Sequence, residues 1–90
     1  MRIEWTRTAL ANLARLVEFL EDHSPTAAER AKEVIFGATA RLAQFPHSGR
    51  PSAKDPQLRE LLVTFGNYGY SLLYRVHDDC VVITNVKHQR

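Results

Sequence analysis

The sequence predicts an α+β fold in which a short N-terminal strand and an antiparallel two-helix hairpin precede a three-stranded antiparallel sheet. Two observations lead to this fold class. Between residues 6 and 45, apolar side chains recur at three- and four-residue spacing, which is typical of helices with one buried face. Between residues 58 and 90 they alternate with polar ones, which is typical of half-buried strands. Helical patterns followed by strand patterns predict separate helical and sheet layers.

The first elements are a strand and a helix. Ile3 and Trp5 lie on one side of an alternating segment, and Thr6 has the side chain of a helix N-cap. Trp5 is expected to pack on Leu10 as a hydrophobic staple. The helix should end before Pro25, because proline disfavours helical geometry in the preceding residue. Its expected buried residues are Leu10, Leu13, Leu16, Val17 and Leu20.

The second helix starts at once. Either Ser24 caps it with Pro25 in the first turn, or Thr26 and Glu29 form a capping box. The short connection makes the two helices antiparallel. Residues 46–56 contain three prolines and one glycine, and we expect them to form a loop. The expected buried residues of this helix are Ala31, Val34, Ile35, Ala38, Leu42 and Phe45.

Three strands should fill the rest of the chain. Gly66-Asn67 and Asp78-Asp79 supply the turn chemistry between them. The alternation places Arg75 on the face opposite Tyr70 and Tyr74, and these tyrosines are expected in the core rather than as platforms that stack RNA bases. The side chains expected on one face of each strand are Leu61, Val63 and Phe65, then Tyr70, Leu72, Tyr74 and Val76, then Val82, Thr84 and Val86.

Length and composition limit the protein class. Ninety residues predict a single domain, residues 1–90. The single cysteine, Cys80, cannot form an internal disulfide, and no apolar run reaches membrane-spanning length, so we expect a cytoplasmic protein without a membrane partner. The spacing of histidines, acids and Cys80 fits no metal site, and neither a metal nor a cofactor is expected. Residues 41–90 hold seven Lys/Arg against four Asp/Glu, and this basic half should meet an acidic partner.

The order of the elements and five motifs along the chain together resemble the RelE/ParE superfamily over essentially the whole chain. The motifs are Ser24-Pro25 with Ala27-Ala28, Phe45-Pro46-His47-Ser48-Gly49-Arg50, Leu58-Arg59-Glu60-Leu61, Tyr74-Arg75-Val76 and Val86-Lys87-His88-Gln89-Arg90. The resemblance implies a toxin of a type II toxin–antitoxin module, of the kind associated with plasmid stabilisation and growth inhibition. It also implies neutralisation by a cognate antitoxin, usually with a ribbon-helix-helix DNA-binding domain.

The branches of this superfamily differ in their action. RelE-like members are metal-independent, ribosome-dependent mRNA endonucleases, whereas ParE-like members bind and poison DNA gyrase. Ser71 stands where the nucleases commonly carry an arginine, and residues 61–64 offer no lysine. Fewer cations mean less stabilisation of the charge that develops on a scissile phosphate. The resemblance therefore favours a ParE-like, non-enzymatic gyrase poison, with a RelE-like nuclease as the alternative and a toxin fold without toxicity as a third reading.

The candidate site residues lie in the basic half of the chain. His88 matches the placement of an acid/base histidine in several nucleases of the superfamily, and Arg59 and Arg75 are the accompanying candidates if the protein is a nuclease. Arg59 is equally suited to a structural role, and Arg75 to a surface cross-strand pair. The residues expected to bind a partner or phosphate are Arg50, Arg59, Arg75, Lys87, His88 and Arg90.

Overall fold

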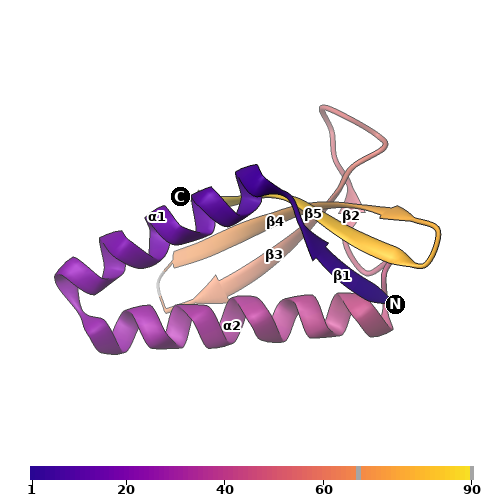
Figure 1. Ribbon diagram of the computed structural model, residues 1–90. Helices are drawn as coiled ribbons and strands as arrows, with labels where there is room; N and C mark the ends of the chain where they lie inside the picture. The colour runs from indigo at the N-terminus through magenta and orange to yellow at the C-terminus, as the bar shows by residue number, and fades with distance from the viewer. Residues whose placement is uncertain (67, 90) are drawn as a thin grey trace.

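Two helices cover one face of a five-stranded mixed sheet (Figure 1). The computed structural model describes residues 1–66 and 68–89, so that Asn67 and Arg90, both named above, lie outside the described residues. The strand order across the sheet is β1-β5-β4-β3-β2. The elements are β1 (Arg2–Trp5), α1 (Arg7–His23), α2 (Pro25–Gln44), β2 (Arg50–Pro51), β3 (Arg59–Phe65), β4 (Tyr68–His77) and β5 (Cys80–Gln89).

The predicted α+β class is confirmed, and the sheet gains a strand at each edge. β1 pairs in parallel with the start of β5, with Ile3 opposite Val81. β2 occupies two residues of the predicted loop and pairs with β3, with Arg50 opposite Glu60. Neither pairing leaves a local pattern in the sequence, because the partner of β1 is distant and β2 is too short to show alternation.

The helix boundaries follow from side-chain caps. Thr6 Oγ1 accepts a hydrogen bond from the Ala9 N–H at 3.1 Å. Ser24 ends α1 through its N–H, which donates to Leu20 O at 2.6 Å, and begins α2 through its Oγ, which accepts from the Ala27 N–H at 3.2 Å. Of the two predicted starts for α2, the structure therefore has the one with Ser24 as the cap.

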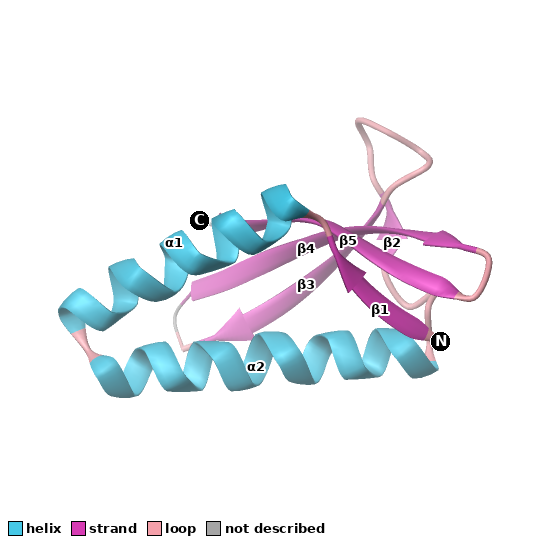
Figure 2. Cartoon of the chain, viewed as in Figure 1, coloured by secondary structure: helices cyan, strands magenta, loops and turns pink. Residues whose placement is uncertain are grey.

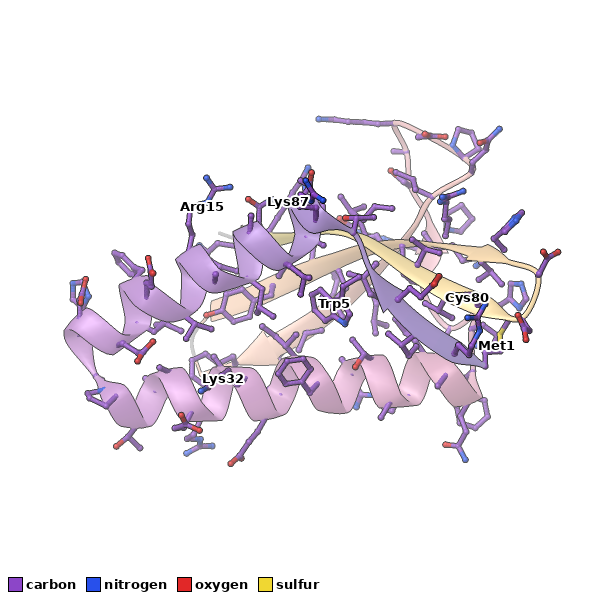
Figure 3. All side chains as sticks on the ribbon, viewed as in Figure 1. Met1, Trp5, Arg15, Lys32, Cys80 and Lys87 are labelled. Carbon is purple, nitrogen blue, oxygen red and sulfur yellow. The ribbon has the colours of Figure 1, made fainter. Side chains whose placement is uncertain are left out.

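The prediction of burial is wrong for two residues of the helical faces. Leu10 is 52% exposed, because the buried face of α1 follows Ala9 and Leu13 instead. Phe45 is 62% exposed because α2 ends before it. Trp5 packs edge-on against Phe36 of α2, with ring centroids 6.0 Å apart, and this contact takes the place of the expected staple. Figure 3 shows Trp5 between the two helices.

A bulge in β5 corrects the expected pattern of the last strand. Leu73 pairs with Asn85 but Tyr74 pairs with Ile83, so Thr84 is an extra residue. The bulge shifts the alternation by one position. Val81 and Ile83 before it, and Val86 after it, are buried in the core, whereas Val82 and Thr84 are not.

The core is one hydrophobic cluster. It lies between the hairpin and the sheet, which Figure 2 distinguishes by colour. Within the described part of the chain, neither helix is long and apolar enough to cross a membrane. The buried members of the cluster are Ala9, Leu13, Ala31, Ile35, Ala38, Leu42, Val63, Tyr70, Leu72, Tyr74, Val81, Ile83 and Val86.

Candidate functional site

The predicted site residues are divided between the two faces of the sheet. Directly paired residues of antiparallel strands project to the same side. Arg59 pairs with Tyr74, and His88 with Tyr70, so both lie on the side that the helices cover. Lys87 pairs with Ser71, which together with Arg75 lies on the opposite, uncovered side; we call this side the open face.

The residues on each face are also far apart. The β4 residues that pair with Arg59 and His88 are four positions apart. Likewise, the β4 residue that pairs with Lys87 lies four positions before Arg75. Four residues correspond to about 13 Å at roughly 3.3 Å per residue. A phosphate contacts side chains within hydrogen-bonding distance, so the division between the two faces keeps Arg59 and His88 from sharing one scissile group with Arg75 and Lys87.

Arg59 holds the loop before β2 rather than facing solvent. Its Nη1 donates to Gly49 O at 2.6 Å and to His47 O at 3.3 Å. A guanidinium can satisfy two carbonyls at once because its donors form a fixed fork. Of the two roles predicted for Arg59, the geometry supports the structural one.

Tyr74 completes this anchor from inside the core. Its hydroxyl donates to Pro46 O at 2.8 Å and accepts from the Gly49 N–H at 2.9 Å. Residues 46–49 are thus fixed by one buried hydroxyl and one guanidinium; we call Arg59 and Tyr74 the loop anchor. Within the motif Phe45 to Arg50, which marked the resemblance, the loop anchor therefore holds the backbone of Pro46, His47 and Gly49.

His88 lies on the helix side near the end of β5. Its ring contacts Tyr70 edge-on, with centroids 5.6 Å apart, and its side chain is exposed. Burial raises the pKa of the Tyr70 hydroxyl above its ordinary value. Arg50, the remaining described candidate, is exposed and forms an ion pair with Glu60 at 3.4 Å.

The open face carries an apolar row that the sequence analysis missed. Leu62, Leu73 and Val82 lie on β3, β4 and β5, and none of them belongs to the core cluster. The bulge at Thr84 hid this row, because only the shifted register brings Val82 onto the face of Leu73. No phenylalanine, tyrosine or tryptophan among the side chains described here lies on the open face, since Phe65, Tyr70 and Tyr74 all project toward the helices.

Cys80 is buried at the start of β5. Its thiol donates to Glu4 Oε1 at 3.2 Å. Burial, followed by the hydrogen bond to Glu4, raises the pKa of the thiol above its ordinary value. A thiol that resists ionisation is a poor nucleophile.

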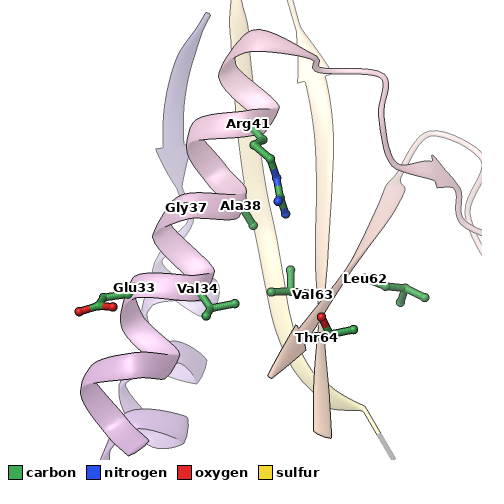
Figure 4. Close-up of a pocket in the computed structure, with 8 residues that line it drawn as sticks. All are labelled: Glu33, Val34, Gly37, Ala38, Arg41, Leu62, Val63 and Thr64. Carbon is green, nitrogen blue, oxygen red and sulfur yellow. The ribbon is translucent and has the colours of Figure 1, made fainter. Parts of the chain in front are cut away.

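One shallow groove lies between α2 and β3, with a volume of about 320 Å³. Figure 4 shows Val34 facing Val63 across it, Arg41 directed toward the strands and Glu33 directed away from them. Within the described residues, no three His, Cys, Asp or Glu side chains gather closely enough to hold a metal ion. The groove is lined by Glu33, Val34, Gly37, Ala38, Arg41, Leu62, Val63 and Thr64.

Comparison with known proteins identifies the family. Residues 3–90 match the family described as the ParE toxin of the type II toxin–antitoxin system parDE. The chain belongs to the ParE toxin family. It is 40% identical over 86 residues to Toxin RelE3 of Caulobacter vibrioides, an alignment that covers 96% of this chain and 91% of that protein.

Other relatives of this ParE-family toxin agree. It is 35% identical to the putative toxin Y4kP of Sinorhizobium fredii, over 92% of this chain and 83% of that protein. The structure of a chromosomal ParDE toxin–antitoxin system from P. aeruginosa has a TM-score of 0.84 and 27% identity, and covers all of this chain and 97% of that one. The predicted superfamily is therefore confirmed, and the protein is a toxin of a type II toxin–antitoxin system.

Proposed function

We propose that this toxin acts in the cytoplasm by binding a protein target, DNA gyrase, and that a cognate antitoxin with a ribbon-helix-helix domain neutralises it. The observation that carries the proposal is the division of the three nuclease candidates between the two faces of the sheet, with His88 and Arg59 on one face and Arg75 on the other. Electrostatic stabilisation of a phosphoryl transition state needs cations aimed at one point. Arg59, moreover, is occupied with the carbonyls of Gly49 and His47.

The alternative function is that of a ribosome-dependent nuclease. Because relatives of this chain are named RelE toxins, the experiment must distinguish the two functions. The chain is expressed from a tight promoter, and DNA supercoiling and mRNA integrity are followed in the same cells. We expect supercoiling to fall while mRNA stays intact. Codon-positioned mRNA cuts with unchanged supercoiling would contradict the proposal.

The variant His88→Ala distinguishes the proposed gyrase binding from ribosome-dependent cleavage of mRNA. Removal of a general acid or base costs about 10²–10⁴-fold in rate. A nuclease that uses His88 would therefore lose its cleavage and its toxicity. We expect the variant to fold and to remain toxic, because the His88 ring is exposed and contacts the core residue Tyr70 only edge-on.

A further inference from the structure

We propose that Asn12 and Asn85 form a clasp that closes the free edge of β5 and prevents this strand from pairing with a second copy of the toxin. The clasp is a hydrogen bond between the two side chains, in which Asn12 Nδ2 donates to Asn85 Oδ1 at 2.6 Å. Pairing between sheet edges is a general route to self-association, and natural sheets carry features that prevent it. The inference concerns the assembly of the chain and is independent of the proposed target.

The outer edge of β5 is covered by β1 over only part of its length. β1 pairs with residues 80–83, whereas β5 continues to Gln89. On its other side β5 is bonded to β4. From residue 84 onward, the backbone groups that point away from β4 therefore meet no strand within the described part of the chain. A strand of a second copy would bond to such groups.

Asn85 crosses this edge from one face of the sheet to the other. It pairs with Leu73, so it projects from the open face. Asn12, however, lies on α1, which covers the opposite face (Figure 1). The hydrogen bond between the two amides therefore carries the Asn85 side chain around the edge of β5, into the place where an added strand would lie.

The clasp also occupies a backbone donor that an added strand would need. The Val86 N–H donates to Asn85 Oδ1 at 2.8 Å. Arg15 Nη2 donates to Asn12 Oδ1, and this bond directs the Asn12 amide nitrogen toward Asn85. Asparagine side chains that bond the nearby backbone offer it an alternative to the sheet ladder. Asn85 therefore satisfies the Val86 N–H within the chain.

Thr6 closes the position that precedes the clasp. Its Oγ1 donates to Thr84 O at 3.3 Å. Thr84 and Val86 thus each have one backbone group bonded to a side chain of the same molecule. Only residues 87–89 of β5 lie beyond Val86, whereas a strand commonly has about 5–6 residues. The edge that remains is too short for stable pairing.

The opposite edge of the sheet is protected by other features. β2 is two residues long, and its Pro51 has no N–H to donate. α2 borders the rest of β3 across the groove. Short edge strands, prolines and neighbouring helices all limit edge pairing. β5 is ten residues long and contains no proline, so its edge depends on the clasp.

Two variants open the clasp from its two sides. Asn85→Leu keeps a branched side chain of similar shape but has no oxygen to accept the two hydrogen bonds. Asn12→Ala removes the donor on α1 and leaves β5 unchanged, so it decides the question if Asn85→Leu does not fold. Thermal unfolding shows whether each variant folds.

Two further variants serve as controls. Asn85→Asp is the conservative change, because a carboxylate oxygen can still accept from both Asn12 and Val86. Thr64→Val makes a polar-to-apolar change at an exposed residue of β3, outside the clasp. Both controls should be as monomeric as the wild type.

Self-association of the purified toxin is measured by sedimentation equilibrium over a range of protein concentrations. A two-fold symmetric dimer uses the same surface of both copies, so a released Val86 N–H contributes twice. We expect the dissociation constant of the Asn85→Leu dimer to be at least about tenfold lower than that of the wild type. Asn12→Ala should shift the dissociation constant in the same direction by a smaller factor.

Amide hydrogen exchange locates the contact. In concentrated Asn85→Leu, the peptide that spans residues 84–89 should exchange more slowly than in dilute solution. Protection that appears only outside β5 would assign the association to an apolar leucine and would overturn the inference.

Three other results would also overturn it. The first is that Asn12→Ala and a folded Asn85→Leu stay as monomeric as the wild type. The second is that either control associates as strongly as Asn85→Leu. The third is that the wild type itself pairs through residues 84–89, because the clasp would then fail to close the edge.

Discussion

At Gly49 the backbone passes so close to its neighbours that a side chain would collide with them. A Cβ atom there would lie 2.6 Å from Tyr74 Oη and 2.8 Å from Glu60 O. Neither neighbour can move freely, since the hydroxyl is bonded to Pro46 and Gly49 and the carbonyl belongs to β3. The absence of a side chain at this position is therefore a condition for the loop anchor.

Gly49→Ala should lower the free energy of unfolding by about 1–3 kcal/mol, which is the usual cost of overpacking. Gly37→Ala is the control, because a Cβ at Gly37 in α2 meets nothing within 4 Å. Alanine in a helix interior should raise the stability there by about 0.5–1 kcal/mol. Urea unfolding measures both, and a stabilising Gly49→Ala would contradict the anchor geometry.

At the scale of the element, Ser24 serves two helices at once. Its N–H closes the last turn of α1 and its Oγ caps the first turn of α2. Ser24→Ala should destabilise the protein by about 1 kcal/mol, the usual value of an N-cap hydroxyl. Thr26→Ala removes the hydroxyl of the capping box that did not form, and should change stability by less than about 0.5 kcal/mol. Equal losses in thermal unfolding would show that both caps are used.

The bulge in β5 makes opposite predictions for adjacent valines. Val81 is buried in the core, whereas Val82 lies partly exposed on the open face. Val81→Thr buries a hydroxyl in apolar surroundings and should cost about 1–3 kcal/mol. Val82→Thr makes the same chemical change and should cost less than about 0.5 kcal/mol. Chemical denaturation of the pair checks the register, and the reverse order of losses would contradict it.

The sequence sufficed for elements whose signals are local. Both helices, their caps at Thr6 and Ser24, and β3 and β4 follow from periodicity and capping chemistry over a few residues. The pairing of β1, the formation of β2 and the bulge in β5 each depend on a partner strand elsewhere in the sequence. No local sequence pattern therefore predicts them. For the same reason Arg59 could not be assigned, because its partners, Gly49 and His47, are fixed only when the loop folds back on β3.

At the scale of the whole molecule, two buried ionisable groups, the Tyr70 hydroxyl and the Cys80 thiol, make the stability depend on pH. Burial raises the pKa of Tyr70 above its ordinary 10.0 and, together with Glu4, that of Cys80 above its ordinary 9.0. Both groups therefore hold their protons more tightly in the folded state than in the unfolded state. Their contribution is fully present below the ordinary pKa values and is lost as the pH rises above them.

Urea unfolding between pH 8 and pH 10.5 should accordingly show stability falling as the pH rises. Cys80→Ala should make the fall smaller, because one of the two titrating groups is removed. A variant with the same pH dependence as the wild type would assign the effect to Tyr70 or to other groups.

The pairing of β1 with β5 has a consequence for the order of events during synthesis. Residues 2–5 leave the ribosome before their partners, residues 80–83. Contacts of such sequence separation form late, after the chain between them is available. β1 can therefore join the sheet only once β5 has left the ribosome, and until then the nascent toxin lacks its completed fold. The time of synthesis, as well as affinity, thus favours an antitoxin that is already present when β5 emerges.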